Sequence, residues 1–164
     1  MIRPTFSWND YFSGTSIETT LSGEHKTRQN PSVSSVYVLN CLFNGFTSGS
    51  NGGALYCTSV TSLLIESSSF FSCKTSSSQG GAIYFINYNS QCVLYGVCGY
   101  DCYSTYTSDP SYYQFAIINV NENALSKNYI NYSSISRCVN ERTNSYHMLE
   151  LGNGKICCPS FNMS

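Results

Sequence analysis

The residues of this chain that could carry out chemistry are mainly its nine cysteines, nine acidic residues and two histidines. Cysteine and histidine together can bind structural zinc, which usually takes four ligands from two well-spaced pairs. The candidate ligand sets are Cys92, Cys98 and Cys102, and Cys157, Cys158 and His147. Neither set contains a paired Cys-x-x-Cys spacing, so the sequence predicts no metal site and no cofactor.

Carboxylates are the second group that could support catalysis. Polysaccharide lyases and hydrolases need clustered carboxylates or a positioned base. Between Thr61 and Val120 the acidic residues are Glu66, Asp101 and Asp109, and they fall at different positions of the repeat described next. The serine and cysteine side chains have no well-placed histidine to activate them. We therefore expect that the protein is not an enzyme.

A repeated hexapeptide indicates the elements that position these residues. Residues 51–56 read Asn-Gly-Gly-Ala-Leu-Tyr and residues 79–84 read Gln-Gly-Gly-Ala-Ile-Tyr, an offset of 28 residues. The same offset aligns Phe43 with Phe71. The paired glycines of the repeat are Gly52, Gly53, Gly80 and Gly81. Glycine suits sharp turns and close approach of a neighbouring backbone, so we expect these four at corners of the fold.

The repeat continues with decreasing similarity. At an offset of 29 residues, Cys102 follows Cys73. The third unit carries Gln-Phe-Ala-Ile at 114–117 in place of Gly-Gly-Ala-Ile, after an insertion at 105–113. A fourth and weaker unit places Cys138 on Cys102. The chain is therefore a series of similar units rather than two unrelated halves.

Short runs of Val, Ile, Leu, Tyr and Phe separated by Gly, Ser and Asn are typical of strands, and no window has a sustained helical period. One unit cannot bury its own apolar face, whereas stacked units share a continuous core. The sequence therefore predicts an all-β solenoid of about four coils of roughly 28 to 36 residues. We expect the coils over residues 33–151, an irregular segment or cap over 1–32, and a C-terminal end over 152–164 where a longer protein would continue.

The alignment places Cys73, Cys102 and Cys138 at one position of successive coils. Stacked neighbours would have Cα atoms about 4.8 Å apart, which is within the range of a disulfide. Buried cysteines also act as small hydrophobic side chains, and both interpretations stay open. The same alignment makes Asp101 and Arg137 neighbours, which predicts a surface ion pair.

The Gly-Gly-Ala-Ile element at 80–83 and the Phe-Phe-Ser-Cys element at 70–73 resemble the repeats of polymorphic outer-membrane proteins and of repeat-rich surface proteins of parasitic protists. In that family a Phe-x-x-Asn motif accompanies Gly-Gly-Ala-Ile, and here Cys73 stands in place of the Asn. The resemblance covers about residues 33–151. It implies a right-handed parallel β-helix that is displayed on cell surfaces and takes part in adhesion, and it supplies no catalytic residues.

Composition limits the partners that we expect. Eight basic and nine acidic residues give a formal net charge of −1, without a basic cluster, so we expect no nucleic-acid binding. No apolar stretch approaches the roughly 20 residues of a membrane-spanning helix. The first residues lack the apolar segment of a signal peptide. Strand edges and apolar side chains at a weakly capped C-terminal end favour end-to-end self-association.

Tyrosines around the insertion form a candidate patch for a glycan or protein partner, namely Tyr103, Tyr106, Tyr112 and Tyr113. Tyrosines on a polar loop suit such contacts, and covering a widened coil is their alternative role. Two acceptor sequons predict N-glycosylation at Asn131 and Asn162. The sequons and the many cysteines favour an extracellular or cell-surface location within a longer parent protein.

The leading functional hypothesis is a non-enzymatic, surface-type β-helix module for binding or adhesion. The alternative is a carbohydrate-active β-helix that resembles polysaccharide lyases or hydrolases. A cluster of carboxylates on one face would favour the enzyme, and an aromatic patch without such a cluster would favour the binding module.

Overall fold

The computed structural model describes residues 7–76, 79–105, 114–139 and 147–164, and short parallel strands make up nearly all of its secondary structure. The one helix within these residues is α1 (Trp8–Tyr11), a single turn. The strands form three sheets and about four turns of a parallel β-solenoid. The predicted fold class is therefore confirmed.

The largest sheet has ten strands and forms two walls of the solenoid. The first wall contains β1 (Thr19–His25), the first half of β2 (Ser35–Asn44), β5 (Ser62–Glu66), β9 (Gln91–Tyr95), β13 (Lys127–Asn131) and β16 (Lys155–Cys157). The second wall contains the second half of β2, β6 (Ser69–Phe71), β10 (Cys98–Tyr100), β14 (Ser134–Ser136) and β17 (Asn162–Met163). Because β2 pairs with both β5 and β6, it joins the two walls into one sheet.

Two smaller sheets complete the coils. The four-stranded sheet contains β4 (Leu55–Tyr56), β8 (Ile83–Ile86), β12 (Ala116–Asn119) and β15 (Leu149–Gly152). The three-stranded sheet contains β3 (Thr47–Ser48), β7 (Lys74–Thr75) and β11 (Tyr103–Ser104). All pairings in both sheets are parallel, so each strand lies on its counterpart from the preceding coil.

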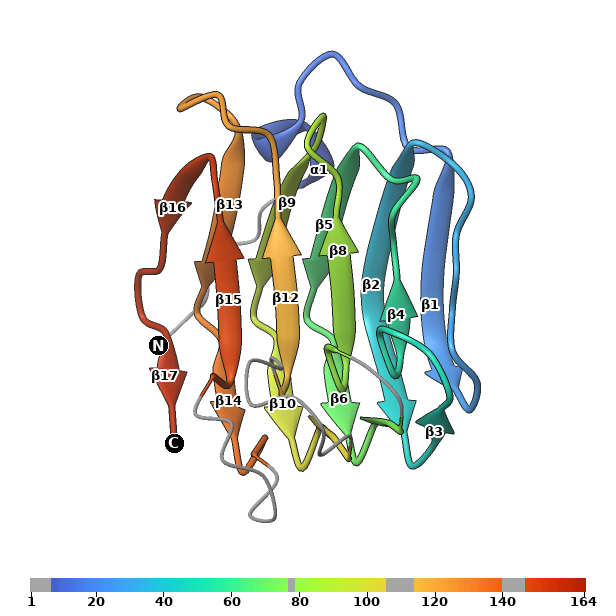
Figure 1. Ribbon diagram of the computed structural model, residues 1–164. Coiled ribbons are helices and arrows are strands. Elements are labelled where there is room, and N and C mark those ends of the chain that lie inside the picture. The colour runs from blue at the N-terminus through green and yellow to red at the C-terminus, as the bar shows by residue number, and fades with distance from the viewer. Residues whose placement is uncertain (1–6, 77–78, 106–113, 140–146) are drawn as a thin grey trace.

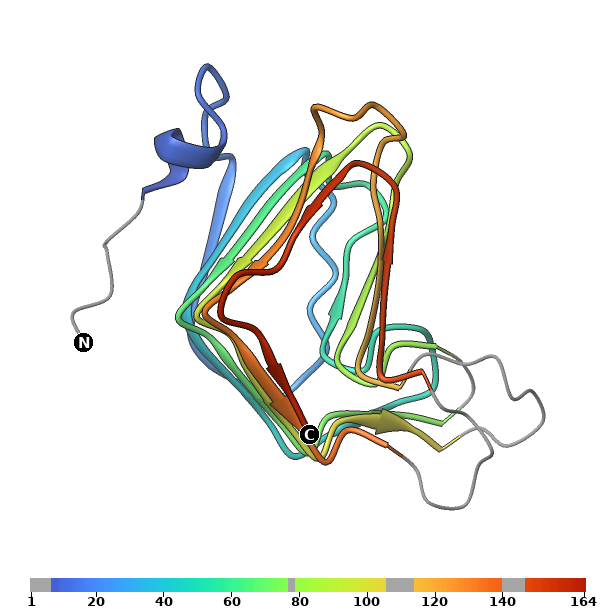
Figure 2. The same cartoon turned by 90° about the vertical axis from the view of Figure 1, so that its left-hand side faces the viewer.

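The coils wind in a right-handed sense. Figure 1 shows the chain rising along β8, β12 and β15 in front and descending along the large sheet behind, while it advances from β1 towards β17. Figure 2 shows the coils nearly end-on, with the walls enclosing a common interior. The handedness agrees with the strong preference of parallel strand crossovers for the right-handed connection.

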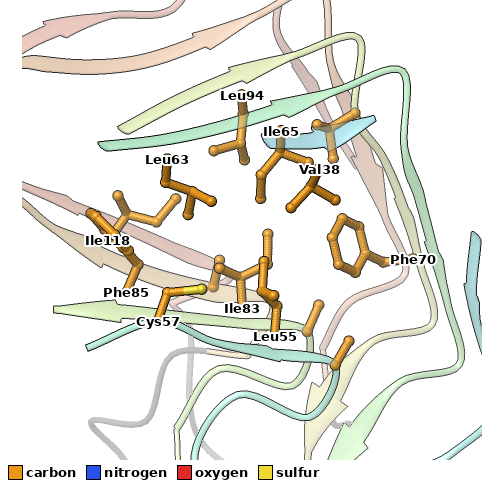
Figure 3. Close-up of a cluster of buried hydrophobic side chains, with 14 of the residues drawn as sticks. Val38, Leu55, Cys57, Leu63, Ile65, Phe70, Ile83, Phe85, Leu94 and Ile118 are labelled. Carbon is orange, nitrogen blue, oxygen red and sulfur yellow. The ribbon is translucent and has the colours of Figure 1, made fainter. Parts of the chain in front are cut away.

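The interior is filled by apolar side chains stacked in register. Val38, Ile65 and Leu94 occupy one register position on β2, β5 and β9 and are fully buried. Leu55 and Ile83 face them from β4 and β8 (Figure 3). Full burial of such a side chain stabilises a fold by about 1.5–3 kcal/mol. Each coil obtains this burial from its neighbours, so the coils depend on one another for stability.

The two glycines of each hexapeptide have different structural roles. Gly52 and Gly80 have φ angles of 66° and 68°, a left-handed conformation that other residues adopt at a cost. A Cβ atom on Gly53 would lie 1.9 Å from the carbonyl oxygen of Gly81. A Cβ atom on Gly81 would lie 2.4 Å from the backbone nitrogen of Tyr103. The first glycine allows the turn, and the second allows the coils to approach.

The predicted register between the first two coils is wrong by one residue on the large sheet. Phe43 pairs with Phe70, an offset of 27 residues, and not with Phe71. On the four-stranded sheet Leu55 pairs with Ile83 at the expected offset of 28. The second coil therefore contains one additional residue between these two walls. A single inserted residue changes the offset without disturbing the hexapeptides from which it was read.

The third coil is also shifted by one residue from the predicted alignment. Ala116 pairs with Ile83, so Gln114 occupies the position of Gly81. The Gln114 side chain is fully buried, and its Oε1 atom accepts a hydrogen bond of 3.1 Å from the backbone nitrogen of Ser104. A buried polar side chain thus replaces a glycine because it satisfies a backbone donor.

The parallel pairing extends beyond the expected range of 33–151 at both ends. Strand β1 pairs with β2 over seven residues, within the segment expected to be irregular. Strands β16 and β17 pair with β13 and β14, within the expected C-terminal end. Ile156 and Met163 occupy core positions of this last coil and are 52% and 53% exposed.

Helix α1 lies outside the solenoid and does not cover its end. Figure 2 shows the helix beside the outer face of the large sheet. Trp8, Tyr11 and Phe12 form a buried cluster there with strand residues that include Leu64 and Val93. Covering the end of the core was one expectation for residues 1–32, and for α1 it is wrong.

Candidate binding surface

The aligned cysteines lie at the corner where the second wall turns into the three-stranded sheet. Each follows a residue with positive φ, and the pairs are Ser72 and Cys73, Asp101 and Cys102, and Arg137 and Cys138, with φ angles of 49°, 54° and 52°. The left-handed residue bends the chain and interrupts the regular ladder of backbone hydrogen bonds. The next side chain then points into the core, where all three cysteines are fully buried.

The thiols replace the interrupted ladder. The backbone nitrogens of Cys73 and Cys102 each donate to the Sγ atom of the next coil's cysteine at 3.3 Å. Each thiol in turn donates to the carbonyl oxygen two residues earlier, at 3.4, 3.4 and 3.2 Å for Cys73, Cys102 and Cys138. Neither a disulfide nor simple apolar packing describes this arrangement, in which sulfur serves as a hydrogen-bonding bridge between coils.

The corner between the two walls of the large sheet uses serine in the same way. The backbone nitrogens of Cys41 and Val97 donate to the Oγ atoms of Ser68 and Ser133 at 3.0 Å. Both hydroxyls donate to the carbonyl oxygen two residues earlier, at 2.8 and 2.9 Å. The equivalence of Cys and Ser at the two corners supports a structural role for the thiols.

All nine cysteines are free, and six of them are buried. Burial raises the pKa of the Cys102 thiol, and hydrogen bonding to Cys102 raises the pKa of Cys138. Such thiols stay protonated and are poor nucleophiles. Within the described ranges, no group of three or more His, Cys, Asp or Glu side chains could hold a metal ion.

Carboxylates of the described residues have separate partners. The Tyr37 hydroxyl donates to Glu66, and Asn119 Nδ2 donates to Glu150 Oε1 at 2.9 Å. Asp109 lies outside the described residues. Acid–base or nucleophilic glycoside chemistry needs two carboxylates that face one sugar ring, and Glu66 and Glu150 are engaged on different walls.

Of the predicted tyrosine patch, Tyr103 is described, whereas Tyr106, Tyr112 and Tyr113 lie outside the described residues. The ammonium group of Lys74 lies 4.5 Å from the centroid of the Tyr103 ring. The same Nζ atom is 3.5 Å from Asp101 Oδ2, which also accepts a 2.8 Å hydrogen bond from Ser72. Hydrogen bonding to Tyr103 and the charge of Asp101 hold the pKa of Lys74 above its ordinary value.

The predicted ion pair between Asp101 and Arg137 is wrong. Asp101 pairs with Lys74 of the preceding coil, and the guanidinium of Arg137 lies over the Tyr100 ring at 5.6 Å from its centroid. The backbones are neighbours as predicted, since Asp101 N donates to Ser136 O at 3.3 Å. Arginine is weakly hydrated and stacks well on aromatic rings, which gives its long side chain an alternative to the carboxylate.

These contacts define a corner patch that consists of Phe71, Lys74, Tyr100, Asp101, Tyr103 and Arg137. Phe71 and Tyr100 pack with ring centroids 6.4 Å apart, and Tyr100 is 38% exposed. Arg137 is exposed as well. The patch therefore combines aromatic rings with two cations on successive coils, in a chain of which only 10% is charged.

A second aromatic feature was missed in the sequence. The rings of Tyr56 and Tyr84 stack at 5.4 Å with an interplanar angle of 15°, and the guanidinium of Arg28 covers Tyr56 at 4.5 Å. Burial and the neighbouring Tyr56 raise the pKa of Tyr84. The signal was available, because both tyrosines end the repeated hexapeptide. Their faces are already covered, so the stack presents ring edges and hydroxyls outward.

The two sequons differ in accessibility. Asn162 is exposed on β17. Asn131 hydrogen-bonds the Tyr11 side chain beneath α1, and its Oδ1 atom is buried without a hydrogen-bond partner. The sequon hydroxyl of Ser133 is 3% exposed and engaged in the corner described above. In this fold Asn162 can accept a glycan, whereas a glycan on Asn131 would require α1 to move.

Among the described residues, no helix is long and apolar enough to pass through a bilayer. No protein-family model, curated protein or solved structure matches the chain.

Proposed function

We propose that the protein is a non-enzymatic β-solenoid binding module whose corner patch contacts a glycan or a protein partner. The observation that carries this proposal is the gathering of Tyr100, Tyr103, Lys74 and Arg137 on neighbouring coils. Aromatic rings and arginine dominate the energetics of recognition surfaces, because they bury large areas at low entropic cost. The rigid coils hold these side chains in place before binding, which lowers the entropic cost of association.

The chemistry of the remaining surface supports binding rather than catalysis. Glu66, Asp101 and Glu150 are each committed to a different local partner. The alternative proposal, a carbohydrate-active β-helix, needs a converging pair of carboxylates. Incubation of the protein with pectin, alginate and xylan, followed by detection of new reducing ends or unsaturated products, tests that alternative. Product formation would replace the binding proposal with the enzymatic one.

The test of the binding proposal is a comparison of variants on an array of glycans and on intact cells. Tyr100→Ala and Arg137→Gln remove exposed parts of the patch without touching the core. We expect each to reduce binding at least tenfold. The matched control is Tyr88→Ala, since Tyr88 is a 58% exposed tyrosine that belongs to another loop. Equal binding by all variants would overturn the patch as the contact surface.

We also propose that the module works at a cell surface, in line with the resemblance to surface-protein repeats. The exposed Asn162 supports this location, because its side chain is accessible to a glycan in the folded protein. Site-resolved mass spectrometry of protein from its native source tests the proposal. Occupied Asn162 would support it, and an unmodified Asn162 would count against it.

End-to-end self-association through the last coil is a further part of the proposal. Ile156 and Met163 are exposed at core positions, next to unpaired edges of β16 and β17. Such edges pair readily with other strands. We expect light scattering to detect association that Ile156→Thr combined with Met163→Ser reduces. Equal association of the variant and the original protein would contradict this contact.

A further inference from the structure

The N-terminal segment 7–17 is a self-contained unit. The Ser7 backbone nitrogen donates to Asp10 Oδ2 at 2.6 Å, which closes a capping box over α1. The indole nitrogen of Trp8 donates to the carbonyl oxygen of Thr15 at 2.6 Å, and Thr15 N donates to Phe12 O at 3.1 Å. These bonds fold the segment onto itself, so its conformation does not require bonds to the solenoid.

The segment covers an apolar strip on the outer face of the first wall. The strip consists of one register column, Tyr37, Leu64, Val93 and Tyr129, together with Tyr95 and Tyr132. Outward positions of a solenoid are normally exposed, yet Leu64 and Val93 are fully buried here. Trp8, Tyr11 and Phe12 provide the cover and are 5%, 9% and 2% exposed. We refer to these three side chains as the plug.

The plug is held by side chains alone. Within the described part of the chain, the backbone hydrogen bonds of residues 7–17 stay inside the segment, and the first to the solenoid is Glu18 N to Ser35 O at 3.1 Å. Undocking therefore leaves every strand pairing intact. The docked state also leaves Asn131 Oδ1 buried without a partner, which carries a desolvation cost.

The connection between plug and solenoid allows the plug to reach another molecule. Residues 13–18 are mostly exposed, and Gly14 has a φ angle of 84°. Six extended residues span about 20 Å. This link is free of strand pairing, since β1 begins at Thr19. Segments that are docked by side chains and joined by such a hinge are prone to exchange between identical chains.

We propose that the strip is an interface between two copies of this chain, in which each copy inserts its plug into the strip of the other. The occupant is the same in both states, so exchange preserves every contact of the plug and forms a closed dimer with two-fold symmetry. The docked intramolecular form is then the monomer of the same equilibrium, favoured at low concentration.

Two full-length variants test the exchange by complementation. Trp8→Ala combined with Phe12→Ala removes the plug and leaves the strip. Val93→Glu keeps the plug and places a carboxylate in the strip, where it becomes exposed on the outer face once the plug leaves. Ile17→Ala is the matched control in the Val93→Glu background, because Ile17 lies in the same segment and is 40% exposed.

Trp8 is the only tryptophan, so its fluorescence reports the plug directly. We expect the Val93→Glu chain to emit at long wavelength, and its emission to shift to shorter wavelength when the plug-deficient chain is added at about 100 µM, far above the micromolar scale of modest affinities. Light scattering should show a mass twice that of the monomer for the mixture and not for either variant alone. The Ile17→Ala control should behave like its parent. If both variants retain the far-ultraviolet spectrum of the solenoid and the mixture shows neither change, the exchange proposal is overturned.

Discussion

Gly99 and Phe115 together fill one position of the core. Gly99 pairs with Phe70 in the register column that begins at Phe43, whose ring stacks on that of Phe70 at 4.8 Å. The ring of Phe115 enters the space beside Gly99 and meets Phe70 edge-on at 6.1 Å. A Cβ atom on Gly99 would lie 2.4 Å from Phe115 Cε2. An aromatic side chain of another strand segment thus takes the place that the glycine leaves open.

This relationship predicts that Gly99→Ala destabilises the fold by about 1–3 kcal/mol, the usual cost of overpacking a core. Phe115→Leu in the Gly99→Ala background should recover part of that loss, because the smaller side chain makes room for the added methyl group. Urea unfolding of the single and double variants measures the coupling. Additive losses would contradict the proposed sharing of space.

The thiol corner predicts a clear order of substitutions at Cys102. Serine retains a donor and an acceptor, so Cys102→Ser should be tolerated better than Cys102→Ala. Alanine leaves the buried backbone nitrogen of Cys73 without an acceptor, at a cost of about 1–3 kcal/mol. Thermal unfolding under reducing conditions measures the order. Cys98→Ala, at an exposed cysteine, is the control and should be nearly neutral. An alanine variant as stable as the serine variant would contradict the bridging role.

The close approach of coils predicts that Gly53→Ala is severely destabilising. Its Cβ atom would lie 1.9 Å from the carbonyl oxygen of Gly81, and both are backbone positions that cannot move independently. We expect a loss of more than about 3 kcal/mol or failure to fold, beyond the usual effect of a point substitution. Gly49→Ala is the matched control, since no atom lies within 4 Å of its added Cβ atom. Chemical unfolding of both variants decides the matter, and equal stability would count against the register.

Docking of α1 should depend on alkaline pH. Burial raises the pKa of Tyr11 from its model value of 10.0 to about 12, so the folded state binds the phenolic proton more tightly than the unfolded state. Its contribution to docking is complete below pH 10 and is lost as the pH rises through 12. We expect Trp8 emission to move to longer wavelength over this range. Tyr11→Phe should shift the transition to higher pH, and an unchanged transition would exclude Tyr11 as its cause.

The repeated hexapeptides and the strand-like runs between them determined the architecture from the sequence alone. A glycine pair, an inward alanine and an apolar residue at near-constant spacing encode a turn and a buried strand locally, without reference to distant residues. The column of Cys73, Cys102 and Cys138 could be aligned for the same reason. The chemistry of the column could not, because the left-handed residue before each thiol is not readable from composition.

Only the tertiary structure decided the register, the partner of Asp101 and the position of α1. One inserted residue in a turn moves every pairing on the following wall but leaves the pattern unchanged. Lys74 and Arg137 are both near Asp101, and the choice between them depends on the rings of Tyr100 and Tyr103. The strip under α1 becomes apolar only when strands from several coils align their outward residues. Such long-range coincidences arise from folding, so the local sequence does not contain them.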